Sequence, residues 1–259
     1  MNDSLLTAPP QACSLIVQSV EGGHVLTQNM DLPAHMVGSQ MALRLGGDGM
    51  TPTVVLSAAG MIGLTGATAA GLAVGVNTLL MLNHAADGLP VAFAMRHTLG
   101  ARDRAEGHAR LSAVTHASGQ HYALATRSGA TSLECSASFC AEVPVPDSGR
   151  LLHSNHPLVS TDIDASAQAR LGAGGFNESS TSRLDWLEAH QGDIATADDV
   201  QALFDDPQAP ICMRPETNGG SSTFATVLYA MTDRPSVRMR QGGADNAAWQ
   251  AFDLPDGGL

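Results

Sequence analysis

The chain has 259 residues, of which 44% are hydrophobic and 15% are charged, and this composition excludes a disordered or fibrous protein. The 13 basic and 25 acidic residues give a formal net charge of −12, so there is no basic surface to bind nucleic acid or an anionic membrane. A chain of this length buries a substantial core, and we expect one domain.

The first third of the chain predicts a series of strands. Residues 13–20 and 24–31 are short β-type runs separated by Glu21-Gly22-Gly23, which is the pattern of a hairpin. The chain therefore opens with paired strands. Further strands are expected at residues 42–45, 53–58, 60–66 and 71–80.

Part of this region has a second interpretation. Residues 60–82 contain no charge over 23 positions, which is long enough for a membrane helix. The five glycines and Asn77 in this run favour buried strands instead, because glycine disfavours helix interiors and marks tight backbone packing. We expect buried strands and no membrane partner, with the membrane helix as the alternative.

Helices enter the pattern after residue 89. Residues 91–100 and 102–114 predict two helices, the second with apolar residues at roughly helical spacing. This order predicts an α+β fold in which antiparallel sheets are layered and helices cover the outer faces. The remaining expected elements are strands at 121–126, 131–135, 151–155, 222–231 and 236–241, and helices at 179–189 and 196–204.

The spacing of the cysteines indicates the redox state of the cellular compartment. Those at positions 13, 135, 140 and 212 form neither the CxxC pairs typical of zinc sites nor the dense pattern of a disulfide-stapled secreted domain. The opening residues also lack the basic and apolar regions of a signal peptide. We therefore expect a reducing, cytoplasmic setting in which Cys135, Cys140 and Cys212 are structural residues.

Cys13 has two interpretations. It stands at the start of the first predicted strand, directly after a leader rich in Ala, Pro and Gln. A free cysteine at such a position is commonly a small buried hydrophobic residue. A nucleophilic thiol would need a base and a donor to the oxyanion, which other segments have to supply.

Four segments of the chain carry a family resemblance. They are Cys13, QNMD at 28–31, GMIGLTGATAAGLAVGVNTL at 60–79 and HSNHPL at 153–158. In order and spacing they resemble the acyl-CoA:6-aminopenicillanic acid acyltransferase family, the peptidase C45 group of N-terminal-nucleophile hydrolases, and are more distantly similar to choloylglycine hydrolases. The resemblance extends from Cys13 to about Leu254.

The fold that this resemblance implies is a four-layer αββα sandwich of two antiparallel sheets. It would occupy residues 13–259 as a single domain, preceded by a short leader at residues 1–12. Relatives usually have a longer segment before the cysteine, so a propeptide supplied as a separate chain is left open.

The resemblance also implies a cleavage that creates the catalytic base. The family's cysteine becomes the first residue of the mature chain, which here means self-cleavage between Ala12 and Cys13. The freed α-amine, with an unperturbed pKa of about 8, then takes the thiol proton directly or through a water. A glycine commonly precedes the family's cysteine, and alanine is small enough for us to expect cleavage here.

Two more catalytic residues follow from the resemblance. Asp31 matches an aspartate suited to hold the amine and orient the nucleophile, although it also suits a turn that closes the hairpin. Asn155 matches the asparagine whose side-chain amide donates to the oxyanion. Its neighbours His153 and His156 are two histidines without a third ligand, so we expect no metal.

Substrate contacts are expected at four positions. Asn29 and Thr68 lie in the matched segments, Thr68 at a place where relatives often carry asparagine. Ser222 and Thr223 open a late strand that contributes to the family's substrate pocket, although such runs also serve as strand entries. Arg183 on a predicted helix is expected to be a solvated charge, with carboxylate binding as the alternative.

These residues together predict an acyl-enzyme formed on Cys13. We expect hydrolysis or transfer of a small or mid-sized hydrophobic acyl group from a small-molecule amide or thioester. No cofactor is expected, acyl-CoA is one candidate substrate, and a homo-oligomer is left open. The alternative function is a non-catalytic binding or assembly protein that keeps the fold without being processed, motivated by the short leader and Thr68.

Overall fold

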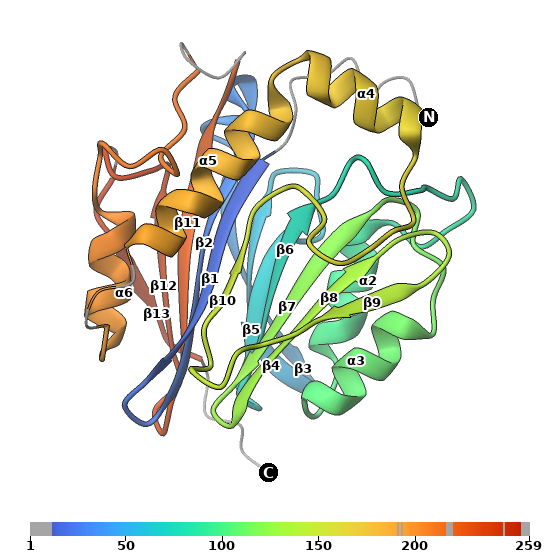
Figure 1. Ribbon diagram of the computed structural model, residues 1–259. Helices are drawn as coiled ribbons and strands as arrows, with labels where there is room; N and C mark the ends of the chain where they lie inside the picture. Colours follow the sequence, from blue (N-terminus) through green and yellow to red (C-terminus); the bar gives the residue numbers. More distant parts are fainter. Residues whose placement is uncertain (1–11, 191, 193, 216–219, 246, 255–259) are drawn as a thin grey trace.

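Two antiparallel sheets form the centre of the molecule (Figure 1). The computed structural model describes residues 12–190, 192, 194–215, 220–245 and 247–254. Of the predicted leader, residues 1–11 lie outside the described residues. One sheet has six strands and the other has seven, and they pack face to face on a shared apolar core.

The six-stranded sheet, called the first sheet below, has the strand order β10-β1-β2-β11-β12-β13. β1 and β2 form the predicted hairpin, and Gly22 in its turn has a φ of 81°, which favours glycine. Alternate residues of β1 face opposite sides, so Leu15 packs between the sheets and Ile16 packs under the outer helices. The strands are β1 (Ala12–Val20), β2 (Gly23–Pro33), β10 (Leu151–His153), β11 (Ser221–Met231), β12 (Ser236–Gln241) and β13 (Gln250–Phe252).

In the seven-stranded second sheet, the strands follow one another in chain order from β3 to β9. Gly75 marks a close approach to the first sheet, because a Cβ at this position would lie 2.4 Å from Leu15 Cδ1. The strands are β3 (Gln40–Gly47), β4 (Met50–Ala58), β5 (Thr65–Thr68), β6 (Leu72–Thr78), β7 (Gln120–Thr126), β8 (Gly129–Cys135) and β9 (Cys140–Val143).

Helices cover the outer faces of both sheets (Figure 1). α5 and α6 pack on the first sheet, where Leu187 and Phe204 join the cluster of Ile16. α2 and α3 pack on the second sheet through residues such as Leu99 and Leu111. This arrangement confirms the predicted four-layer αββα sandwich. The helices are α2 (Val91–Leu99), α3 (Arg104–Ser112), α4 (Ala165–Ala173), α5 (Phe176–Ala189) and α6 (Ala197–Phe204), with a 3-10 turn η1 (Ala34–Met36).

The structure adds elements that the sequence did not predict. β9 and β13 have four and three residues, which is too short to show a period. α4 buries only Ala167 and Leu171, so its apolar face is narrow. Residues 60–82 contain β5 and β6 rather than a helix, as expected. Among the described residues, no helix is long and apolar enough to cross a membrane.

We expect Gly75→Ala to lower the free energy of unfolding by about 1–3 kcal/mol, because the new Cβ would overlap Leu15 where the sheets meet. Gly46→Ala in β3 is the matched control, since no heavy atom lies within 4 Å of its Cβ position, and its effect should stay within about 0.5 kcal/mol. Urea unfolding of both variants measures the difference. Equal stabilities would contradict the close approach of the sheets at Gly75.

Candidate active site

Cys13 lies on β1 with its side chain in the core between the sheets. It is in register with Met30 of β2, and its Sγ is 3.4 Å from Met30 Sδ. Only 2% of Cys13 is exposed. In the intact chain, the thiol is therefore enclosed by protein.

The backbone of Cys13 is held by polar side chains from distant segments. Its N–H donates to Asn155 Oδ1 at 2.7 Å. Arg183 of α5 donates from Nη1 to the Cys13 carbonyl oxygen, and from Nη2 to the same Asn155 Oδ1 at 2.9 Å. Asn155 Nδ2 in turn donates to the carbonyl oxygen of Thr78, at the end of β6, at 3.0 Å. Both sheets and α5 thus meet at the side chain of Asn155, which binds the nitrogen of the predicted cleavage bond.

Asp31 lies across the β1–β2 pair from Ala12 and is fully buried. Its Oδ1 accepts a hydrogen bond from Thr223 Oγ1 at 2.7 Å, whereas Oδ2 has no hydrogen-bond partner among the described residues. Burial raises the pKa of Asp31 to about 6, although the charge of Arg183 and the hydrogen bond from Thr223 act to lower it. A carboxyl with one open oxygen therefore lies beside the predicted cleavage bond.

The Cys13 thiol stays protonated at neutral pH in the intact chain. Burial and the charge of Asp31 raise its pKa to about 12, against lowering effects of the Asp31 N–H, Gln28 and Arg183. The thiolate is the reactive form of cysteine. In the intact chain the thiol is consequently a weak nucleophile, and its attack on a carbonyl requires loss of the thiol proton.

Ser180 of α5 holds Asn155 from the helix side. Its Oγ accepts the Asn155 backbone N–H at 2.8 Å, and it lies 2.8 Å from His156 Nδ1 and 3.0 Å from Ser154 Oγ. Ser180 and Arg183 are three residues apart, so they share one face of α5. One helix therefore fixes both the backbone and the side chain of Asn155.

Glu134 of β8 holds the same segment from the second sheet. This buried carboxylate accepts the backbone N–H groups of Leu158, Val159 and Ser160 at 2.5–3.0 Å, and it lies 2.9 Å from His153 Nε2. Burial alone would raise the pKa of Glu134, but the hydrogen bonds and charge of His153, with the backbone N–H groups, lower it. Residues on both sides of Asn155 are thus bound to one carboxylate.

Comparison of the sequence with models of protein families identifies the family of this chain. The model of a family described as acyl-coenzyme A:6-aminopenicillanic acid acyl-transferase matches residues 20–243. The chain belongs to this acyl-transferase family. The resemblance found in the sequence is thereby confirmed. The match begins after Cys13, so it does not itself include the predicted nucleophile.

Solved structures share the fold of this acyl-transferase family member. The penicillin V acylase from Agrobacterium tumefaciens has a TM-score of 0.53 and 14% identity, over 93% of this chain and 86% of that chain. A mutant of the conjugated bile acid hydrolase from Clostridium perfringens has a TM-score of 0.59 and 13% identity, over 95% of this chain and 94% of that chain. A search of curated proteins finds no significant match.

Two residues predicted to contact substrate form no side-chain hydrogen bond with Cys13, Asp31 or Asn155 in the part of the chain that the structure describes. Asn29 donates to Ile211 O at 2.7 Å and accepts from Thr226 Oγ1 at 2.8 Å, so its amide is used within the protein. Thr68 lies near the Leu72 end of β6, where its Oγ1 accepts the Leu72 N–H. The site is at the Thr78 end, roughly 20 Å along the strand at ~3.3 Å per residue. The hydrogen bonds of Asn29 and Thr68 thus involve other parts of the protein, and their predicted contacts with substrate stay predictions.

A residue of the same motif lies at the site instead. Asn77 of β6 donates to His153 O at 3.3 Å, and its Oδ1 is 2.9 Å from His121 Nδ1. The ring of His121 stacks on that of His153 at a centroid distance of 3.7 Å. Asn77 therefore adds a third support to the segment that carries Asn155. In the sequence, Asn77 stands out as a single amide side chain within an otherwise apolar strand.

Ser222 and Thr223 line a cavity of about 500 Å³ in the acyl-transferase chain. Thr223 connects this cavity with Asp31, because its hydroxyl donates a hydrogen bond to the Asp31 carboxyl. Val37, Met213 and Ala247 give it apolar surface, and Cys212 also lines it. A mixed lining beside the site suits a small substrate with an apolar group.

Arg183 is a correction to the sequence analysis. It was expected to be a solvated charge, but only 2% of it is exposed and it binds Cys13 and Asn155. A buried cation needs partners to offset its lost hydration. Burial lowers the pKa of Arg183, and the negative charge of Asp31 acts against this shift, so Asp31 is one of these partners. The linear sequence gave no sign of this burial, because α5 carries polar residues on most of its faces.

The histidines and cysteines near the site are bound to protein groups. His153 lies against Glu134, whereas His156 lies against Ser180, so the two rings have different partners.

Cys135 and Cys140 form a disulfide across β8 and β9. The cysteine pattern had indicated a reducing setting, and it missed this pair because a cross-strand contact does not show in the spacing.

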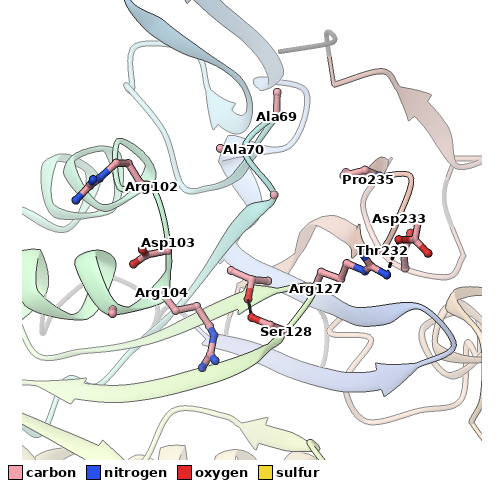
Figure 2. A pocket seen from close by; sticks show the side chains of 13 residues that line it. Ala69, Ala70, Arg102, Asp103, Arg104, Arg127, Ser128, Thr232, Asp233 and Pro235 are labelled. Atoms are coloured by element: carbon pink, nitrogen blue, oxygen red, sulfur yellow. Dashed lines mark hydrogen bonds and ion pairs between the residues drawn. The ribbon is translucent and has the colours of Figure 1, made fainter. Parts of the chain in front are cut away.

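A cavity larger than the one lined by Thr223 lies near the other end of β6 from Thr78 (Figure 2). It measures about 750 Å³ and is lined by turns near the Leu72 end of β6, including Arg127, which pairs with Asp233 at 2.6 Å. Its described lining contains no thiol and no imidazole. Size alone therefore does not mark the active site in this protein.

The pKa of Asp31 gives a testable pH dependence. Because the pKa of about 6 in the folded chain exceeds the ordinary value of 3.8 for an aspartate, the folded state binds the proton more tightly. The contribution of Asp31 to stability therefore falls as the pH rises from about 4 to about 6. Asp31→Asn removes this loss. We expect the slope of unfolding free energy against pH to be more positive in the variant across that window.

Urea unfolding at several pH values between about 4 and 6 measures this slope. Both proteins should carry Cys13→Ala, so that the chain stays intact before residue 13. Identical slopes with and without Asp31→Asn would contradict a raised pKa for this carboxyl.

Proposed function

We propose that this member of the acyl-transferase family cleaves itself between Ala12 and Cys13, and that the mature chain hydrolyses or transfers an acyl group through a thioester on Cys13. The observation that carries the proposal is the hydrogen bond from the Cys13 nitrogen to Asn155 Oδ1, with Arg183 on the same oxygen. These contacts hold the nitrogen that cleavage would turn into a base.

The cleavage step uses the groups of the intact chain. Cys13 Sγ attacks the carbonyl carbon of Ala12, a C–S bond forms, the C–N bond breaks, and the thiol proton goes to the leaving nitrogen. Water then hydrolyses the thioester, which releases the leader as an acid and restores the thiol. Because Arg183 and Asn155 bind the Cys13 backbone on both sides of its side chain, they would keep the sulfur and nitrogen in place during both steps.

Cleavage changes the hydrogen bonds around the nitrogen. The amide nitrogen of Cys13 has one hydrogen, which Asn155 accepts, whereas a terminal ammonium has three. Asp31 Oδ2, buried and without a partner among the described residues, is an acceptor for one of the added hydrogens. The positive charge of the Cys13 ammonium would also stabilise the buried carboxylate of Asp31. This complementarity supports the predicted role of Asp31 in holding the amine.

In the mature chain, the α-amine acts as the base. It takes the proton of the Cys13 thiol, the thiolate attacks the carbonyl carbon of an amide or thioester, and the leaving group departs with the proton from the ammonium. Water or an amine then attacks the acyl-enzyme, gives its proton to the α-amine, and releases an acid or a new amide. An amine with a pKa of about 8 is well matched to this exchange near neutral pH.

Asn155 has a double role in this proposal. Its Oδ1 positions the Cys13 nitrogen, and one hydrogen of Nδ2 is donated to Thr78 O. An amide group has two such hydrogens, so the second is available to the oxyanion that forms on the acyl carbonyl. The oxyanion role expected from the sequence thus applies to this second hydrogen.

The cavity beside Asp31 supports a substrate of limited size. We propose that the acyl group or its acceptor lies among Val37, Met213, Ser222 and Thr223. The structural neighbours are named an acylase and a hydrolase, which agrees with acyl transfer to water. Acyl-CoA remains a candidate donor, since a thioester undergoes the same attack.

The enclosure of Cys13 also favours a second candidate function. A thiol with 2% exposure and a pKa of about 12 suits a binding or assembly protein that is never processed. The two functions differ in the fate of the Ala12–Cys13 bond, which makes them separable by mass.

Intact-mass measurement of the purified protein tests the proposal. We expect a mature chain that begins at Cys13, and we expect Cys13→Ala to retain the preceding residues, because it lacks the attacking sulfur. Cys212→Ala is the matched control, since Cys212 is also a free and buried cysteine, and it should be cleaved like the original chain. An original chain that keeps Ala12 and resists iodoacetamide at Cys13 would support the binding protein instead.

Substitution of Asn155 tests the positioning of the nitrogen. We expect Asn155→Ala to slow cleavage at least ~tenfold, equivalent to about 1.4 kcal/mol in the barrier, because both the Cys13 nitrogen and Arg183 lose their shared acceptor. Asn83→Ala is the control, because Asn83 binds Asp162 rather than Cys13. The time course of leader loss after synthesis gives the rates, and circular dichroism verifies the fold. An unchanged rate in a folded Asn155→Ala chain would remove Asn155 from the mechanism.

A further inference from the structure

Three potential metal ligands meet on the outer side of the second sheet. Cys135 ends β8, Cys140 begins β9, and His116 precedes β7. One ligand atom from each lies within 4.8 Å of the other two, and His116 Nε2 is 3.6 Å from Cys140 Sγ. Cys135 and His116 are buried, whereas Cys140 is partly exposed. The group is thus enclosed but open to solvent on one side.

The spacing of these atoms fits a tetrahedral zinc ion. With Zn–S bonds of ~2.3 Å and a Zn–N bond of ~2.0–2.1 Å, two sulfur ligands are separated by about 3.8 Å and a sulfur and a nitrogen by about 3.6 Å. The measured distance from His116 Nε2 to Cys140 Sγ agrees with the second value. The sulfurs are joined in the disulfide, and their paired strands keep them adjacent once that bond is broken.

We propose that reduction of the Cys135–Cys140 disulfide creates a site for a thiophilic divalent cation such as Zn²⁺, with Cys135, Cys140 and His116 as ligands. A dithiol reductant donates two electrons and two protons to the disulfide and becomes a cyclic disulfide itself. Binding of the cation then expels the two thiol protons. The same sulfurs serve both states, so the disulfide and the metal exclude each other.

The surroundings of His116 suit this role. Ligation through Nε2 requires the proton on Nδ1, which lies 3.4 Å from the hydroxyl of Tyr122, a partner able to accept it. Nε2 would give up its contact with Leu111 O at 3.0 Å. The fourth position of the ion, on the side of Cys140, is left to water or an added ligand.

The proposed metal site is independent of the proposed function. Its residues are too far apart in the sequence to form a recognisable metal-binding motif. The two cysteines are five residues apart rather than in a CxxC pair, and the β7–β8 hairpin is what brings His116 beside them. Two sulfurs and one nitrogen form the donor set of a zinc site with an open position. Soft thiolate ligands would also select Zn²⁺ or Cd²⁺ over Mg²⁺.

Metal titration of the full chain tests the proposal. The protein should carry Cys13→Ala and Cys212→Ala, so that Cys135 and Cys140 are the remaining cysteines. After reduction and removal of the reductant without oxygen, Zn²⁺ is titrated against a chromogenic chelator, and Cd²⁺ is followed by its ultraviolet thiolate band. We expect one equivalent to bind to the reduced protein, with an affinity at least a hundredfold higher than that of the oxidised protein.

Two variants assign the ligands. Cys140→Ser should abolish the Cd²⁺ thiolate band of a two-sulfur site, and His116→Gln should weaken Zn²⁺ binding at least ~tenfold. His24→Gln is the control for histidines elsewhere and should bind like the parent. Circular dichroism verifies that each variant is folded. The proposal is overturned if the reduced parent binds Zn²⁺ no better than the oxidised parent, or if folded His116→Gln and Cys140→Ser proteins bind as the parent does.

Discussion

The side-chain oxygen of Asn155 is the point on which the candidate site depends. It accepts hydrogen bonds from the Cys13 nitrogen and from Arg183, and the amide of the same side chain binds Thr78 on the second sheet. Polar groups in a buried region need partners, because the loss of water around them is otherwise costly. One side chain therefore connects the strand of the nucleophile, the opposite sheet and an outer helix.

The outer contacts explain how this oxygen keeps its position. Ser180 holds the backbone of Asn155 from α5, and Glu134 holds the flanking residues from β8. These supports come from rigid elements on both sides of the sandwich rather than from loops, which is the arrangement that keeps a site within a fraction of an ångström. Asp31 Oδ2 and Arg183 Nε have no hydrogen-bond partner in the part of the chain that the structure describes, and they belong to the two charged residues beside Cys13. The nitrogen of Cys13 thus has its hydrogen-bond acceptor, whereas the carboxyl of Asp31 has one oxygen without a partner among the described residues.

Local patterns in the sequence predicted the fold well. Alternating apolar residues and the Gly-containing turn between β1 and β2 determined that hairpin, and through its register they placed Cys13 and Asp31 one strand apart. The sandwich followed from the order of strands and helices together with the family resemblance. Short elements such as β9 escaped prediction because four residues carry no measurable period.

The site was only partly predictable, for a physical reason. Cys13, Asp31 and Asn155 occur in segments with a family pattern, and the structure brings them together. Arg183 and Glu134 act through contacts with residues 170 and about 25 positions away, and a linear pattern does not show whether such a charge is solvated or buried. The same holds for the pairing of Cys135 with Cys140, and for Thr68, which lies near the Leu72 end of β6 rather than near Thr78.

The proposed mechanism depends most on a free α-amine at Cys13, which activates a thiol whose pKa is raised to about 12 in the intact chain. The most direct measurement is the rate of iodoacetamide labelling against pH in a partly cleaved preparation, in which mass separates the intact and cleaved chains. The account predicts that the cleaved chain is labelled with a midpoint near that of an α-amine, at about pH 8, while the intact chain stays unlabelled into the alkaline range. The same pH profile for both chains would contradict it.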